Sequence, residues 1–164
     1  MSIPTTEQRL AAVEERLQQI DDRLAITELV NAYCERFDRG DAEGVAALFT
    51  ADATIDYNPD TPTTNGASLA TSMRVGLETI FAATSHHVSN LSITFEDGNT
   101  ARSLCYLDAW HRYHDGSPDG FLWGRYRHRF RRTDQGWRIT DLVLQAAGTI
   151  DFHRARMHGI GRRP

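Results

Sequence analysis

The residues of this sequence best suited to acid–base chemistry near neutral pH are its histidines, and His86 and His87 stand side by side. A neutral imidazole can remove a proton next to a carbonyl group or return one to a leaving hydroxyl. In an extended strand the two rings would point to opposite faces, so we expect His87 to be a surface or structural residue. By position alone, His86 is better explained as the cap of a helix that ends near Thr84.

Metal and thiol chemistry are not expected. His111 and His114 fall near a predicted hairpin tip, where a spacing of three does not bring two rings to one strand face. No third ligand is clearly placed beside them, so we predict no zinc site and no other metal. Cys34 and Cys105 are the only cysteines, and each falls in an apolar periodic segment, which favours two buried, reduced thiols.

A row of four arginines alternates along one stretch and must share one strand face. The row comprises Arg125, Arg127, Arg129 and Arg131. Like charges in a row are typical of a solvated face, or of a face that meets acidic groups of a neighbouring subunit. Nucleic-acid binding is the alternative, but the net charge of −4 and the lack of stacking aromatic residues on that face argue against it. The intervening Tyr126, His128 and Phe130 would point inward.

The elements that position these residues begin with a helix. Apolar residues three and four apart give the seam of a short coiled coil at Leu10, Val13, Leu17, Ile20 and Leu24. About two heptads are short for an independent coiled coil, so we expect residues 1–24 to be an amphipathic arm on this domain or on a neighbour. A second apolar set continues the helix to Phe37, and Gly40 is placed to end it.

Shorter elements follow. Asp41 predicts the N-cap of a short helix, and Ala53–Tyr57 alternates as a strand that Asn58-Pro59 interrupts. A loop then leads to a helix predicted over Ser68–Thr84.

From His87 onward the apolar period changes to two, the period of β-strands. Turn sequences separate four predicted strands, at Val88–Phe95, Ala101–Tyr113, Phe121–Arg132 and Trp137–Ala147. Helices followed by a meander of hairpins indicate an α+β fold in which helices cover one face of a single sheet. Residues 25–150 would form this domain, and residues 151–164, with four arginines and two histidines, would form a tail.

Length and composition limit the possibilities further. A chain of 164 residues with 40% apolar residues is expected to form one domain whose core needs no disulfide or metal. The first residues do not resemble an export signal, and no apolar stretch is long enough to span a membrane. We therefore predict a soluble, cytoplasmic protein without a membrane partner.

Three stretches together resemble the SnoaL-like branch of the nuclear transport factor 2-like superfamily. They are Ile26–Ala53, Ser85–Ser92 and Gly124–Leu142. The resemblance implies a cone-shaped α+β barrel, with N-terminal helices packed on one curved antiparallel sheet around a small-molecule pocket. The superfamily includes dehydratases, isomerases, a dehydrochlorinase, cyclases, epoxide hydrolases and non-catalytic binding modules, so the fold alone does not define the reaction.

The resemblance also implies a catalytic pair. In dehydratase and dehydrochlorinase members, a histidine four residues before an asparagine pairs with an aspartate that ends the first long helix. Here His86 stands four residues before Asn90, and Asp38 closes that helix. Asp38 would fix the tautomer and orientation of the His86 ring. Tyr33 matches a tyrosine of bile-acid dehydratase-like members and would donate a hydrogen bond to a substrate oxygen, or else pack in the core.

Three further residues are predicted to bind substrate. Tyr57 could play a part similar to that of Tyr33. Asp108 and Trp110 share one face of their strand, and they line the pocket if that face is concave or meet solvent if it is not.

These residues predict a cofactor-independent lyase that eliminates water from a hydrophobic alicyclic or aromatic small molecule, with His86 as base and acid. A double-bond isomerase or a cyclase would need the same groups and is the alternative among enzymes. A non-catalytic binding or assembly module is the alternative of another class. The apolar arm and the arginine row also predict a homo-oligomer, either a trimer or a dimer.

Overall fold

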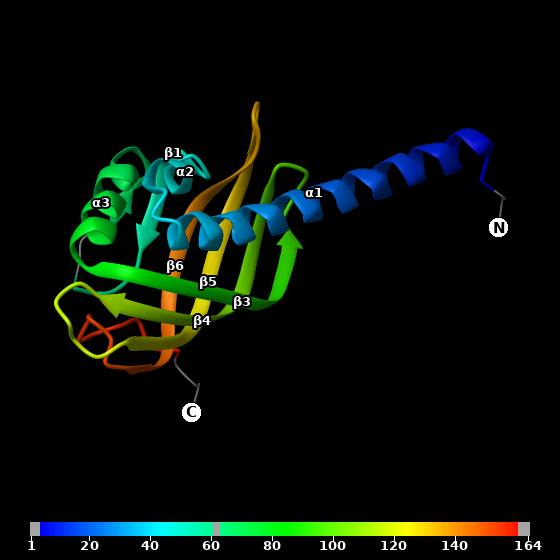
Figure 1. The fold of residues 1–164 in the computed structure, drawn as a ribbon. Coiled ribbons are helices and arrows are strands. Elements are labelled where there is room, and N and C mark those ends of the chain that lie inside the picture. The colour runs from blue at the N-terminus through cyan, green and yellow to red at the C-terminus, as the bar shows by residue number, and fades with distance from the viewer. Residues whose placement is uncertain (1–3, 61–62, 161–164) are drawn as a thin grey trace.

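The computed structural model describes residues 4–60 and 63–160. Its elements are α1 (Thr6–Asp38), α2 (Ala42–Ala46), β1 (Phe49–Asp56), β2 (Thr64–Asn65), α3 (Gly66–Thr79), β3 (Phe81–Phe95), β4 (Thr100–Tyr113), β5 (Gly120–Thr133) and β6 (Gly136–Ile150). Helices α1 and α3 pack against one face of a curved sheet, which gives the predicted α+β layout (Figure 1). We call this covered face the inner face and the opposite one the outer face. No helix in the described ranges is long and apolar enough to cross a membrane.

The predicted cone of helices on one curved sheet is confirmed, but the sheet is open and is mixed where an antiparallel one was expected. Its strand order is β2-β1-β6-β5-β4-β3, and β1 runs parallel to β6 while the other neighbours are antiparallel. The parallel pair arises because the chain leaves β1 through α3, crosses to the far edge at β3, and returns by hairpins until β6 lies beside β1. The edges at β2 and β3 do not pair with each other, so the cone stays open.

Helix α1 is one continuous helix that spans both predicted apolar sets. It begins at a capping box formed by Thr5 and Gln8 and ends where Gly40 takes a positive φ of 71°. Asp22 is the first buried residue, and it accepts hydrogen bonds from Trp137 Nε1 and from the Arg132 guanidinium. The turns before Asp22 project beyond the sheet as a free arm (Figure 1).

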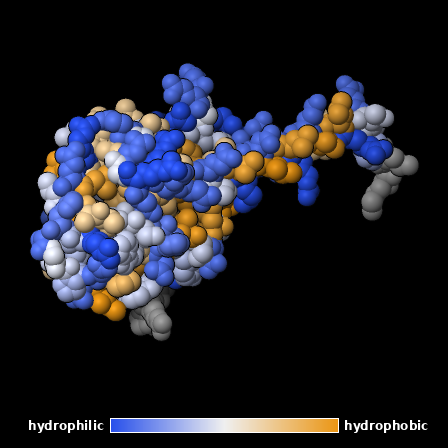
Figure 2. All heavy atoms as spheres, viewed as in Figure 1, coloured by the Kyte–Doolittle hydropathy of each residue, from blue (hydrophilic) through white to orange (hydrophobic). Residues whose placement is uncertain are grey.

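The arm carries its apolar seam in the open. Leu10, Val13, Leu17, Ile20 and Leu24 are each 55–58% exposed. Figure 2 shows this stripe along one side of the arm, bounded by polar residues. The arm therefore contacts its own domain only near its C-terminal end.

The predicted helix over Ser68–Thr84 is wrong at its C-terminal end. Helix α3 ends at Thr79 and strand β3 begins at Phe81. A short apolar run such as Ile80-Phe81 satisfies either periodicity, so the pattern alone placed the boundary too late. His86 therefore lies within a strand, and its interpretation as a helix cap fails. The N-cap at Asp41 is confirmed, because its side chain accepts a hydrogen bond from the Gly44 amide.

The asparagine that follows His86 has a structural role. Asn90 has a positive φ of 52° and lies at a β-bulge between Ser89 and Ser92. Asparagine tolerates this backbone region better than most residues, and a bulge bends its strand. The bulge gives β3 a bend four residues beyond His86.

Alternation along β5 follows the prediction. Tyr126, His128 and Phe130 are buried on the inner face, whereas Arg127, Arg129 and Arg131 are exposed on the outer face. Arg131 pairs with Asp52 at 2.9 Å, and Arg129 lies 4.0 Å from Glu96. Three arginines of the row thus meet solvent in the single chain, whereas Arg125 is half-buried and lies over the Tyr106 ring.

Candidate active site

A cavity of about 470 Å³ lies between α1, α3 and the inner face of the sheet. Its wall is mostly apolar and includes Phe37, Leu69, Met73, Leu77, Phe81 and Leu144. The polar side chains on its wall include Tyr33, Tyr57, His86, His111, His153 and Arg154. A cavity of this size and character suits a small molecule that is largely hydrophobic.

Asp38 and His86 meet at the cavity wall. His86 Nδ1 lies 2.6 Å from Asp38 Oδ1, and the backbone N–H of His86 donates to Oδ2 at 2.8 Å. The ring is packed edge-on against Phe37 at a centroid distance of 4.7 Å, and its side chain is only 4% exposed. With the Nδ1 proton directed at the carboxylate, a neutral ring carries its free lone pair on Nε2. Nε2 has no hydrogen-bond partner among the described residues, and the ring lines the cavity.

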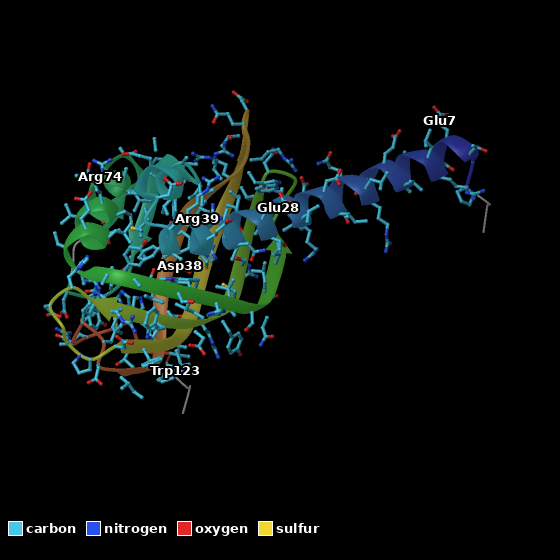
Figure 3. The ribbon with its side chains drawn as sticks, viewed as in Figure 1. Glu7, Glu28, Asp38, Arg39, Arg74 and Trp123 are labelled. Carbon is cyan, nitrogen blue, oxygen red and sulfur yellow. The ribbon has the colours of Figure 1, made fainter. Side chains whose placement is uncertain are left out.

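The Asp38 carboxylate is held ionised although its position is unfavourable for a negative charge. Asp38 is the last residue of α1 and lies above β3 (Figure 3), at the negative end of the helix dipole. Burial by itself would raise the pKa of Asp38. Hydrogen bonds from the His86 ring, the His86 amide and the Thr84 hydroxyl outweigh burial and lower this pKa below its usual value. A carboxylate in this state can stabilise a protonated imidazole.

Tyr33 and Tyr57 form a relay of hydroxyl groups. Their hydroxyl oxygens are 2.9 Å apart, and the Tyr57 hydroxyl lies 3.8 Å from the sulfur of Met73, a weak acceptor. If the Tyr33 hydroxyl donates to the Tyr57 oxygen, the Tyr57 hydroxyl in turn has only the weakly accepting Met73 sulfur to donate to. It can therefore turn and donate to a ligand oxygen. Burial raises the pKa of Tyr57 to about 12 and that of Tyr33 well above its usual value, so both hydroxyls remain donors.

His111 belongs to the site, and the sequence analysis missed it. Its ring is 5.3 Å from that of His86 between centroids, and it is buried with Nδ1 unpaired. Burial, with the nearby rings of His86 and His153, lowers the pKa of His111 to about 3, so the ring is neutral. The sequence contains a signal that His111 faces inward, because His111 continues the alternating apolar face of β4 formed by Leu107 and Ala109.

Asp108 and Trp110 do not line the cavity, so of the two alternatives that the sequence left open, the structure has the one in which they face outward. The alternation that turns Leu107 and Ala109 inward turns these two residues to the outer face. Asp108 is exposed, and Trp110 donates a hydrogen bond to Asp119 at 3.0 Å. Both residues therefore take part in the outer surface.

The C-terminal residues fold back over the cavity and are not a free tail. The chain reverses at Asp151, which has a positive φ of 46°, and Gly159 pairs with Ala146 at the end of β6. His158 Nε2 lies 2.7 Å from Asp56 Oδ1. Phe152, His153 and Arg154 consequently line the cavity. Phe152 and Met157 pack against the core here. The segment has so few apolar residues that its sequence predicted a tail. Residues 161–164 lie outside the described part.

The thiols take no part in the cavity. Cys34 and Cys105 are both free and buried, as predicted, and burial raises their pKa values to about 12 and about 11. Within residues 4–60 and 63–160, no cluster of three or more histidine, cysteine, aspartate or glutamate side chains is arranged to hold a metal ion.

Comparison with known proteins shows which family and which solved structures this chain resembles. The family model described as a SnoaL-like domain matches residues 18–143. A Novosphingobium aromaticivorans protein proposed to be a scytalone dehydratase superposes with a TM-score of 0.83 and 30% identity, over 90% of this chain and 98% of that chain. A second protein from that organism, proposed to be an aromatic ring hydroxylase, gives a TM-score of 0.70 and 28% identity, over 76% and 88% of the two chains.

A more distant structure has the same fold. The type-3 hexachlorocyclohexane dehydrochlorinase of Novosphingobium barchaimii superposes with a TM-score of 0.75 over 90% of this chain and 99% of that one, at 16% identity. No curated protein matches the sequence. Because the family model covers most of the chain and the 30% identity extends over nearly its whole length, this chain belongs to the SnoaL-like domain family.

Proposed function

We propose that the protein is a cofactor-independent lyase that eliminates water from a hydrophobic cyclic small molecule. The observation that carries the proposal is the 2.6 Å contact between Asp38 and His86 at the wall of an apolar cavity. The comparison with a protein proposed to be a dehydratase supports the same class of reaction.

The reaction uses His86, Tyr57 and Tyr33, which line the cavity, together with Asp38, which is hydrogen-bonded to the His86 ring. His86 Nε2 removes the proton from the carbon next to a carbonyl group, and Asp38 stabilises the imidazolium that forms. The Tyr57 hydroxyl, backed by Tyr33, donates a hydrogen bond to the carbonyl oxygen as it gains negative charge. Nε2 then returns the proton to the hydroxyl on the β-carbon, which leaves as water while the double bond forms. The imidazole ends neutral, ready for the next turnover.

Double-bond isomerisation is the second candidate, because the same base could return its proton to another carbon. The two reactions differ in the substrate, which in the first case carries a hydroxyl β to the carbonyl. The closeness of His111 to His86 favours elimination, since a neutral ring at 5.3 Å offers a second polar group near the departing oxygen.

The test uses a substrate whose dehydration is driven by aromatisation. 3-Hydroxy-1-tetralone is a bicyclic β-hydroxy ketone, and its loss of water yields 1-naphthol, which is fluorescent. We expect His86→Gln to lower the enzymatic rate by roughly 10²–10⁴, the usual worth of a positioned acid–base group. His87→Gln is the matched control, because His87 is adjacent but exposed. A His86→Gln protein with turnover close to wild type would exclude His86 as the base, whereas a wild-type protein that binds the ketone without turnover would favour a binding module.

We also infer a homo-oligomer in which the arm packs against a second copy of the chain. The support is the seam of five apolar residues that are more than half exposed, at the spacing by which two helices interlock. Replacing Leu17 and Ile20 together by glutamate should lower the mass measured by light scattering to that of one chain. A wild-type protein of 18.5 kDa in solution would contradict the inference.

A further inference from the structure

One charged residue in the cavity is not used by the proposed reaction. Arg154 is the single arginine, lysine, aspartate or glutamate among the described residues that line the cavity. The guanidinium forms no ion pair within the described part of the chain. The other arginine of this segment, Arg156, is exposed and pairs with Asp60 at 3.1 Å. Arg154 and Arg156 thus differ in exposure and in ion pairing although they lie only two residues apart.

The partly buried position of Arg154 has a cost that an anion would relieve. Burial lowers the pKa of Arg154 because it disfavours the charged form, and the interaction with Tyr57 only partly offsets this. Buried charges in proteins are normally paired, and a guanidinium recognises a carboxylate through two parallel hydrogen bonds. No carboxylate within residues 4–60 and 63–160 pairs with Arg154.

The neighbouring groups also lack partners. Both ring nitrogens of His153 are buried without a hydrogen bond in the described structure, and so is Nδ1 of His111. The proton of Tyr57 has only the sulfur of Met73 as acceptor if Tyr33 donates to its oxygen. Each of these neutral groups can donate to a ligand oxygen or accept from it. This part of the cavity is therefore polar, positively charged and under-satisfied.

Polar and aromatic groups in contact with one another surround the cavity. The ring centroids of His86 and Phe37 are 4.7 Å apart, those of Phe37 and Tyr33 are 6.2 Å apart, and the Tyr33 hydroxyl oxygen lies 2.9 Å from that of Tyr57. Arg154 and the adjacent His153 line the same cavity. A ligand whose anionic group meets Arg154 would lay its apolar body against the apolar part of the cavity wall, which includes Phe37.

We propose that Arg154, with the neighbouring His153, forms a carboxylate-binding subsite, and that the substrate of the lyase is a cyclic hydrophobic carboxylic acid. The substrate part of this inference rests on the proposed function, whereas the subsite itself does not. The carboxylate fixes the orientation of the ligand, and the reacting carbon is presented to His86.

Binding of a matched pair of probes tests the subsite without any need for turnover. 2-Naphthoate and 2-naphthamide have nearly the same shape and differ in charge. Titration calorimetry with the wild-type protein should give an affinity for naphthoate roughly 10- to 100-fold above that for the amide, as expected for a charge-assisted hydrogen-bonded pair. Arg154→Gln should remove this preference, and Arg154→Lys should retain part of it.

Two control variants separate this inference from the proposed function. Arg156→Gln removes a charge from the same segment and should leave the preference intact. His86→Gln should lower turnover of the tetralone by roughly 10²–10⁴ and still prefer naphthoate. Equal affinity for the two probes, absence of naphthoate binding in the wild type, or a preference that survives in Arg154→Gln would overturn the subsite. Those results would leave the role of His86 as base untouched, and a still-active His86→Gln protein would leave the subsite untouched.

Discussion

The two faces of the sheet are made from the same strands and have opposite characters. On β4 and β5 the inner face carries His111, Tyr126 and His128, all buried, whereas the outer face carries Asp108, Trp110 and the arginine row. The outer charges meet water or one another, as in the pair of Arg131 with Asp52. The inner polar groups have few partners, and several have none. The rarer polar residues of the covered face are therefore the ones to examine for function.

The difference follows from the cost of burying a polar group. A surface arginine keeps its hydration, so its presence requires no special explanation. A buried imidazole gives up hydrogen bonds to water, and without a partner it lowers the stability of the fold. His111 and His153 are in that position at the cavity, and a ligand would supply the missing partners.

The largest difference between the two faces should appear in catalysis when the same substitution is made on each. Asp38→Asn removes the charge that holds the imidazolium and allows the wrong tautomer, so we expect turnover of 3-hydroxy-1-tetralone to fall by about 10³–10⁴. Asp108→Asn makes the same change on the outer face and should stay within a factor of about two, because surface substitutions seldom matter. Initial rates of 1-naphthol formation check both. Equal losses in the two variants would remove the functional distinction between the faces.

Acid should destabilise the inner face specifically. Burial lowers the pKa of His128 to about 3, that of His111 to about 3 and that of His153 to about 4. An unfolded histidine titrates near ~6.5, so below that pH the unfolded chain binds more protons than the folded one. These histidines therefore do not change the free energy of unfolding above pH ~6.5, and they lower it as the pH falls from there toward 4. Each histidine contributes up to roughly 1.4 kcal/mol per pH unit.

The slope of unfolding free energy against pH, from urea titrations between pH 7 and pH 4.5, measures this contribution. His128→Gln should reduce the slope by up to the share of one histidine, because it removes one titrating group. Glutamine is chosen because it can still hydrogen-bond to Ser103, whose hydroxyl lies 3.0 Å from His128 Nδ1. His87→Gln, on the exposed side of β3, should leave the slope unchanged. The reverse pattern would show that burial does not keep the inner histidines neutral.

The sequence predicted the inner and outer faces of β5 correctly and those of β4 only as two open alternatives. On β5 the arginine row fixes the parity, because four charges in alternate positions cannot all be buried. On β4 the aromatic ring of Trp110 and the carboxylate of Asp108 can sit on either side, and the decisive signal was the apolar series that ends at His111. The boundary between α3 and β3 and the return of residues 151–160 were missed for another reason. Both depend on tertiary contacts, which local periodicity does not contain.

The smallest effect is expected for the outer face itself. Arg131→Gln breaks an ion pair whose side chains are 47% and 67% exposed, and hydrated pairs of this kind contribute between about 0 and 1 kcal/mol. We expect the free energy of unfolding to fall by no more than this, with the naphthoate affinity unchanged. Phe130→Ala, one position earlier and on the inner face, should cost about 3–5 kcal/mol through loss of a fully buried ring. Chemical denaturation at fixed protein concentration compares the two. A loss above ~2 kcal/mol for Arg131→Gln, accompanied by a lower mass in light scattering, would mean that the arginine row lies in the subunit interface and not in solvent.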